Sequence, residues 1–303
     1  MNRRQFLLAA CLFAVACIVP AVAQPAGKTI KFAQIADVHM VGFTVTPDGR
    51  VCPRLPAHAA GMLTRRYDLA GFTLPQALKQ IREQFAAQFV VFTGDQADDG
   101  NGALGEADER QFKAVAEEKG AGLGLHFACG NHDGSQAKWS EIFGPLNYTF
   151  DAGDLRVVVL NSGSMNPDLE QESSLAALNE LKQAIATAQG KRLIVFVHEW
   201  INPSGIRGMS MARAAEIKQA LAAYPGTVAV MNGHIHSGGY SVADGIHYLT
   251  ARAFCEMPLC YYTFELSADT LTVTENTWNA GQRAFAVGTP KVLAVRESAK
   301  AGK

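Results

Sequence analysis

Five apolar runs in the sequence each end in side chains that can bind a metal ion or transfer a proton. The runs are "FAQIADVHM", "FVVFTGDQADDG", "LHFACGNHDG", "LIVFVHEW" and "VAVMNGHIH". Their ends supply carboxylates, imidazoles and one amide. The metal-ligand candidates are Asp37, His39, Asp95, Asn131, His198, His234 and His236. A single histidine at a strand end is usually a hydrogen-bonded turn residue, but five such ends in one chain favour a shared site.

These side chains predict a centre that holds two metal ions. Oxygen and imidazole ligands suit divalent or trivalent ions such as Fe, Mn, Zn or Co, and the set contains no thiolate. Alternate side chains of an extended segment point to one side, so Asp37 and His39 can reach the same ion. Seven ligands are too many for one ion of ordinary coordination. A carboxylate such as Asp95 can bridge two ions about 3.5–4 Å apart.

The same runs indicate the elements that position these residues. Near-continuous apolar runs are typical of strands buried on both faces. Helical spacing separates several of them, at residues 75–89, 105–118, 173–188 and 210–223, with Pro75 at a first helical position and Ser210 as an N-cap. This alternation predicts an α/β fold. The later runs "IHYLTAR", "CYYTFELSA" and "TLTVTENTW" predict a mixed or antiparallel portion that completes the sheets.

Residues 41–73 interrupt this alternation with three prolines and several glycines. The segment is longer than a simple crossover needs. It follows the first strand, and open α/β sheets bind ligands at the carboxyl ends of their strands. We therefore expect an ordered loop or lid over the site; a surface insertion is the alternative.

Composition and the amino terminus indicate the class and location of the protein. The 303 residues are 48% hydrophobic and 18% charged, with a formal net charge of −1, so nucleic-acid binding is not expected. Residues 1–23 combine two arginines, an apolar stretch and a small-x-small end, which predicts a removable signal rather than a membrane anchor. "RRQFL" is similar to a twin-arginine signal, with an ordinary secretory signal as the alternative. We expect a bacterial periplasmic or secreted protein.

Four cysteines lie outside this leader: Cys52, Cys129, Cys255 and Cys260. An oxidising compartment permits disulfides, and four cysteines allow three pairings. Cys255 and Cys260 are the closest pair in the sequence. Four free thiols are the alternative.

The ordered series "DVH", "GDQAD", "GNHD", "VH" and "GHIH", from Asp37 to His236, resembles the calcineurin-like metallophosphoesterase superfamily. This resemblance implies one domain over residues 24–303, a four-layer α-β-β-α sandwich with two mixed sheets, and a dinuclear site at the carboxyl ends of strands. It also implies the ligand sets. The first ion takes Asp37, His39 and His236; the second takes Asn131, His198 and His234; Asp95 bridges them.

The resemblance further implies roles in phosphoester hydrolysis by metal-activated hydroxide. His132 matches the position of the family's proton donor, and Asp98 matches the acid that orients it. Asp99, in the same doublet, is the alternative orienting acid. Other candidates could neutralise the substrate phosphate or line the cleft. They are Arg65, Arg66, Arg252, Tyr148, Glu199 and Trp200.

The motif order and the short carboxyl-terminal part look closest to bacterial cyclic-nucleotide and glycerophosphodiester phosphodiesterases. This favours hydrolysis of a small external phosphodiester. A periplasmic phosphomonoesterase or nucleotidase is the alternative. A metal-binding protein without turnover is the alternative from another class. Dinuclear hydrolases of amide or lactone bonds typically carry their His-x-His near the first strand, whereas here it follows the fifth run.

Overall fold

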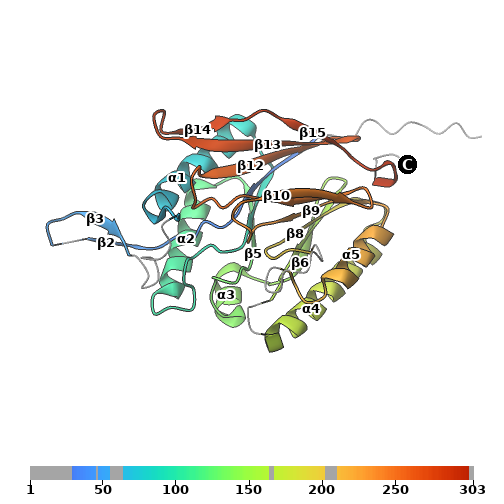
Figure 1. The fold of residues 1–303 in the computed structure, drawn as a ribbon, viewed down its shortest axis with the longest axis horizontal. Coiled ribbons are helices and arrows are strands. Elements are labelled where there is room, and N and C mark those ends of the chain that lie inside the picture. Colours follow the sequence, from blue (N-terminus) through green and yellow to red (C-terminus); the bar gives the residue numbers. More distant parts are fainter. Residues whose placement is uncertain (1–28, 46, 55–63, 164–166, 202–209, 300–303) are drawn as a thin grey trace, which may run out of the picture.

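The computed structural model describes residues 29–299, except 46, 55–63, 164–166 and 202–209. The predicted signal at residues 1–23 lies outside this range. Two sheets pack face to face, with helices on the outer face of each (Figure 1). The predicted class, an α/β sandwich with two mixed sheets, is therefore confirmed.

The first sheet has the strand order β14-β13-β12-β1-β4-β5, with β15 paired to β13. Its parallel strands are β1 (Ile30–Ile35), β4 (Phe89–Thr93) and β5 (Gly124–Ala128). Its antiparallel strands are β12 (Cys260–Leu266), β13 (Thr270–Asn279), β14 (Ala284–Val287) and β15 (Lys291–Ala294). The late strands of the chain thus extend the sheet that its first strand begins.

The second sheet has the order β10-β11-β9-β8-β7-β6. Four of its strands run parallel: β7 (Leu155–Leu160), β8 (Arg192–Val197), β9 (Thr227–Asn232) and β11 (Ile246–Thr250). The edge strands β6 (Tyr148–Ala152) and β10 (Gly239–Ala243) are antiparallel. A buried apolar cluster that includes Phe32, Phe196 and Phe264 joins the two sheets.

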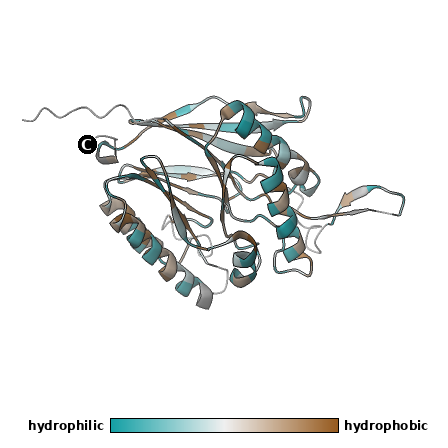
Figure 2. Cartoon of the chain, turned by 180° about the vertical axis from the view of Figure 1, so that it is seen from behind, coloured by the Kyte–Doolittle hydropathy of each residue, from teal (hydrophilic) through white to brown (hydrophobic). Residues whose placement is uncertain are grey.

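The helices form the two outer layers. On the first sheet lie α1 (Tyr67–Gln80), continued by the π-helix η2 (Ile81–Phe85), α2 (Gly105–Lys119) and α3 (Gln136–Phe143). On the second lie α4 (Pro167–Ala186) and α5 (Ala214–Ala223). A short 3-10 helix, η3 (Glu297–Ala299), follows β15. Hydrophilic and hydrophobic residues share each long helix (Figure 2), as expected for a helix that covers a sheet.

Helix boundaries are where the predictions from sequence were least accurate. The first helix begins at Tyr67, so Pro75 lies inside it rather than at its start. Tyr67, Ala70 and Leu74 are buried at helical spacing, and this burial outweighs the cost of about 3 kcal/mol for an interior proline. The last helix begins at Ala214, because Ser210 pairs with Trp200 in an isolated bridge instead of capping the helix.

The segment predicted as a lid contains a hairpin of β2 (Phe43–Val45) and β3 (Val51–Pro53), which projects from the body of the molecule (Figure 1). Its base is anchored on α2, because the Asp108 carboxylate pairs with Arg54 and accepts the Gly42 N–H at 3.0 Å. The segment then enters α1. Its role as a lid stays a prediction.

Candidate metal centre

All seven predicted ligands meet at one edge of the sandwich. Each follows the carboxyl end of a parallel strand: β1, β4 and β5 in the first sheet, β8 and β9 in the second. Potential ligand atoms lie within 4.8 Å of one another in each of two clusters. The first cluster is Asp37, His39, Asp95 and His236. The second is Asp95, His198 and His234.

Left-handed backbone directs several of these side chains inward. Asp37, His39, Asp95 and His234 have φ values of 53°, 46°, 52° and 66°. Such conformations cost about 1–3 kcal/mol each and persist only where the surroundings hold them. The Asp37 N–H donates to the Gly94 carbonyl at 3.2 Å and the His39 N–H to the Asp95 carbonyl at 2.9 Å. The first loop is thereby fixed against the second.

The first cluster presents a lone pair toward its centre. His39 Nε2 is buried, has no hydrogen-bond partner among the described residues, and lies 3.4 Å from Asp95 Oδ2. Burial lowers the pKa of His39 to about 4, so its imidazole is neutral near pH 7. His236 Nε2 lies 3.6 Å from Asp37 Oδ1. Two imidazole nitrogens beside two carboxylates suit a divalent ion.

In the second cluster, several side-chain nitrogen and oxygen atoms lie close to His198 Nε2. His198 Nδ1 faces the Thr93 carbonyl at 2.8 Å, which makes Nδ1 the donor and directs Nε2 inward. Nε2 lies 2.9 Å from Asn131 Oδ1, 3.2 Å from His234 Nδ1 and 3.3 Å from Asp95 Oδ1. Burial would lower the pKa of His198, but Asp95 and Asp37 raise it to about 10. Surroundings that hold a proton there would equally hold a metal ion.

Asp95 lies between the two clusters, with Oδ2 toward His39 and Oδ1 toward His198. Burial would raise the pKa of this carboxyl, but His198 and His39 hold it well below its usual range. The pKa of Asp37 is raised to about 6 by burial, although His198 opposes the shift. The Asp95 carboxylate is thus ionised and placed where a bridging ligand must be.

Two acidic residues that the sequence analysis did not single out support these ligands. Glu256 Oε1 lies 2.7 Å from His236 Nδ1 and so orients its ring. The Asp133 carboxylate accepts backbone N–H bonds from Asp95 at 3.0 Å and from Gly130 at 2.8 Å, besides those of residues 96 and 97. Asp133 could have been suspected from its place in "GNHDG". Glu256 belongs to no motif and is brought near by the fold.

The His132 ring is oriented by a different group from the one that the sequence predicted. Its Nδ1 lies 2.6 Å from the backbone carbonyl of Asp98, whereas we expected the Asp98 carboxylate to orient it. That carboxylate lies 3.0 Å from His39 Nδ1 and also accepts bonds from Arg65 and from the Tyr67 hydroxyl. Asp98 therefore orients a candidate metal ligand through its side chain and His132 through its backbone.

The other cleft candidates divide into two groups. Arg65 reaches the centre, where its guanidinium lies 3.2 Å from His39 Nδ1. Glu199 is buried next to His198 in the chain, and burial raises the pKa of the Glu199 carboxyl to about 7. Arg66 pairs with Asp68, which is exposed. The Tyr148 hydroxyl bonds to the backbone of Phe127. Tyr148, on β6, therefore packs against β5. Trp200 pairs with Ser210 through the backbone.

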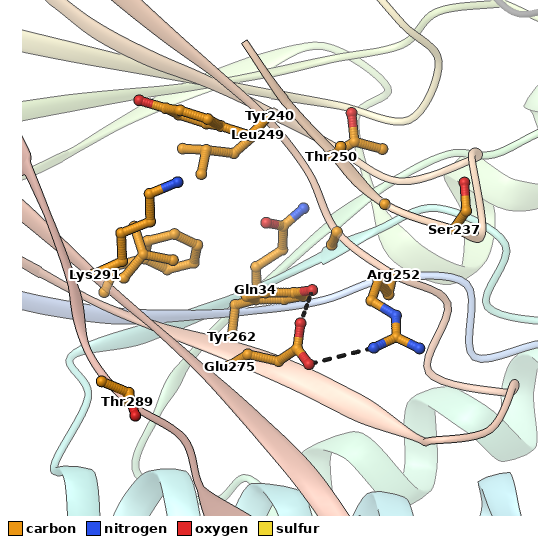
Figure 3. Close-up of a pocket in the computed structure, with 15 residues that line it drawn as sticks. Gln34, Ser237, Tyr240, Leu249, Thr250, Arg252, Tyr262, Glu275, Thr289 and Lys291 are labelled. Atoms are coloured by element: carbon orange, nitrogen blue, oxygen red, sulfur yellow. Dashed lines mark hydrogen bonds and ion pairs between the residues drawn. The ribbon is translucent and has the colours of Figure 1, made fainter.

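Arg252 lies in a separate pocket of about 420 Å³ at the open edge between the sheets (Figure 3). Arg252 lies 3.4 Å from Glu275, which also accepts the Tyr262 hydroxyl at 2.6 Å. Across the pocket, Lys291 Nζ lies 4.0 Å from the centre of the Tyr240 ring. None of the seven candidate ligands lines this pocket, although its Ser237 directly follows His236.

Comparisons with known proteins agree with this geometry. Residues 30–238 match the family described as calcineurin-like phosphoesterases. The chain therefore belongs to that family. No curated protein matches its sequence.

Two solved structures have a similar fold. A dimetal phosphatase of Danio rerio is 15% identical, with a TM-score of 0.64 over 88% of this chain and 99% of that one. GAP50, the anchor in the inner membrane complex of Plasmodium, is 13% identical, with a TM-score of 0.56 over 89% and 90%. At such identities the likeness concerns the fold alone.

In the part of the chain that the structure describes, no helix is long and apolar enough to cross a membrane.

Proposed function

We propose that this protein is an exported phosphoesterase with two metal ions that prefers phosphodiesters. The observation that carries the proposal is the Asp95 carboxylate, whose two oxygens face two separate clusters of ligands. Family membership and the clustered donors support metal-dependent phosphoester hydrolysis. The diester preference and the export are finer steps that rest on the sequence motifs, and the ligand set accepts Fe, Mn, Zn or Co.

The donor set fits two ions. Asp37, His39 and His236 would hold the first, and Asn131, His198 and His234 the second, with Asp95 shared. Bound ions supply the polarisation of phosphoryl oxygens and the activation of a water molecule that hydrolysis needs.

His132 would act on the substrate through Nε2. The backbone carbonyl of Asp98 can only accept a hydrogen bond, so Nδ1 must carry a hydrogen atom. Nε2 is therefore the ring nitrogen left to face the substrate, where it would exchange a proton with a phosphoryl or leaving oxygen. The His132 backbone N–H donates to Asp95 Oδ1 at 2.9 Å, which ties this acid to the shared ligand.

Paired assays test the reaction. Purified protein, with its metal content measured by elemental analysis, would be given bis(p-nitrophenyl) phosphate and p-nitrophenyl phosphate, with and without Mn²⁺. Faster turnover of the diester supports the proposal. Faster turnover of the monoester would make the protein a phosphatase or nucleotidase.

A different class of function is supported by one comparison. The fold is shared with a Plasmodium protein described as an anchor, so the fold by itself does not require turnover. A chain that binds two ions and cleaves neither ester would be a metal-binding protein without turnover.

The proposed location is the periplasm, on the basis of the leader at residues 1–23. The expected partner is a small phosphoester, with neither nucleic acid nor a stable membrane anchor involved. Cell fractionation tests this. Replacing Arg3 and Arg4 with lysine should retain the protein in the cytoplasm, and unchanged export would exclude the twin-arginine route.

A further inference from the structure

A buried thiol lies beside the first cluster. Cys255 is fully buried, and it is not paired with Cys260, which is also a free thiol. Its N–H donates to the backbone carbonyl of Asp37 at 3.1 Å, and its carbonyl accepts the Arg66 N–H at 2.6 Å. The backbone of Cys255 is therefore fixed against a candidate ligand on one side and the start of α1 on the other.

The sulfur reaches the same two imidazoles that serve the first ion. A ring nitrogen of His39, a ring nitrogen of His236 and the Cys255 Sγ lie within 4.8 Å of one another. Two ligands of one ion, at bond lengths of about 2.0–2.3 Å, are separated by at most about twice that length. Both histidines also belong to the cluster with Asp37 and Asp95. The two clusters therefore share both imidazoles.

A second observation points to a ligand at this place. His39 Nε2 is fully buried and has no hydrogen-bond partner among the described residues. A buried polar atom without a partner is costly unless something fills the position it faces. A cation would satisfy this nitrogen, and the Cys255 thiol lies within 4.8 Å of a nitrogen of the same imidazole.

We propose that Cys255 is a further protein ligand of the first ion. The inference rests on the metal centre of the proposed function, but not on the ester that is cleaved. On binding, the S–H bond releases its proton to solvent and the sulfur donates an electron pair to the ion. Cys255 belongs to none of the sequence motifs, whose candidate ligands are all oxygen or nitrogen atoms. A thiolate favours Zn²⁺, Co²⁺ or Fe²⁺ over Mg²⁺ or Ca²⁺.

Cobalt substitution tests the inference by a readout other than activity. The full chain would be loaded with Co²⁺ to two ions, as counted by elemental analysis, and its near-ultraviolet absorption recorded. We expect a sulfur-to-cobalt charge-transfer band in the wild type. The band should disappear in Cys255→Ser and persist in Cys129→Ser and Cys260→Ser, two controls that also replace buried thiols. Circular dichroism establishes that each variant is folded.

X-ray absorption of the cobalt-loaded wild type gives a result that needs no variant. A sulfur atom at about 2.3 Å from cobalt is expected. A wild type with two bound cobalt ions and no sulfur neighbour overturns the inference, as does a band that survives in Cys255→Ser. The ester assays are separate: a band without turnover keeps the thiol ligand and removes the proposed reaction, whereas turnover without a band does the reverse.

Discussion

Asp95 is the residue that both candidate ion positions share. Asp95→Asn keeps the side-chain shape and an oxygen that can accept the His132 N–H, but it removes the negative charge between His39 and His198. We expect the folded variant to lose at least one of two ions and nearly all activity. Elemental analysis and turnover measure this. Glu106→Gln, on the exposed surface of α2, is the control for loss of a negative charge. A fully loaded, active Asp95→Asn protein would show that Asp95 does not bridge.

His132 should matter for chemistry and little for metal binding. Its ring lies near His39 and Asp98, outside the two ligand clusters that contain Asp95, while its backbone N–H, which contacts Asp95, survives substitution. His132→Ala should therefore retain both ions and lose about 10²–10⁴-fold in kcat, the usual loss for a general acid. Parallel metal analysis and steady-state kinetics test this expectation. Unchanged turnover would remove His132 from the mechanism.

Glu256 should act through His236. Its carboxylate lies 2.7 Å from His236 Nδ1 and so orients the ring whose Nε2 faces Asp37. Glu256→Gln keeps the size but loses the charge, and should weaken binding of one ion by about 10–100-fold. Metal titration would measure the change. Glu275→Gln, in the neighbouring pocket, should leave both affinities unaltered; equal losses in the two variants would contradict a specific role for Glu256.

The ends of the strands were predictable, because each of the parallel strands β1, β4, β5, β8 and β9 is a mostly apolar run that is followed by a polar candidate ligand. The starts of helices were harder, since α1 runs through Pro75 and α5 begins four residues after Ser210. Contacts distant in sequence were not predictable at all. Glu256 and Cys255 reach the centre only because the chain after β11 returns across the end of β1, where the Phe254 N–H donates to the Ala36 carbonyl.

The turn after β4 allows a test of how the backbone positions a candidate ligand. Gly94 has a φ of +89°, and a Cβ there would lie 2.2 Å from His198 Nδ1. Gly94→Ala should displace His198, weaken the second ion site and destabilise the fold by about 1–3 kcal/mol. Gly122→Ala is the matched control, because Gly122 has a φ of +90° and open space around its Cβ position. If metal binding is equally reduced in both variants, backbone strain rather than the clash is responsible.

The sandwich places several features that lower the stability of the folded state at one edge. Left-handed backbone, buried carboxylates and the His39 Nε2 atom, which has no hydrogen-bond partner among the described residues, all lie where the two sheets bring their strand ends together. Bound ions would offset these costs, because a ligand that binds only the folded state stabilises it. The ions are therefore expected to contribute to folding as well as to catalysis, and the pH dependence of stability should reveal it.

The pKa shifts fix the sign of that dependence. Burial raises the pKa of Glu199 from 4.5 to about 7, so its effect on stability is largely complete by neutral pH. The wider range belongs to His198, whose pKa rises from 6.5 to about 10 in the folded protein without an ion, despite its burial, because of Asp95 and Asp37. Its contribution to stability is complete below about pH 6.5 and is lost as the pH rises toward 10. Asp37, raised to about 6, and His39, lowered to about 4, titrate below this window and act in opposite directions.

A metal ion must displace the His198 proton, so its affinity should rise as the pH rises. The chelated protein therefore loses stability from about pH 6.5 to 8.5 while the loaded protein gains from tighter binding. We expect the difference in Tm between loaded and chelated protein to widen steadily over this range. Thermal unfolding at fixed free metal concentration measures it. His198→Gln should abolish most of the widening, and a Tm difference that is constant or shrinks with pH would show that His198 does not exchange its proton for an ion.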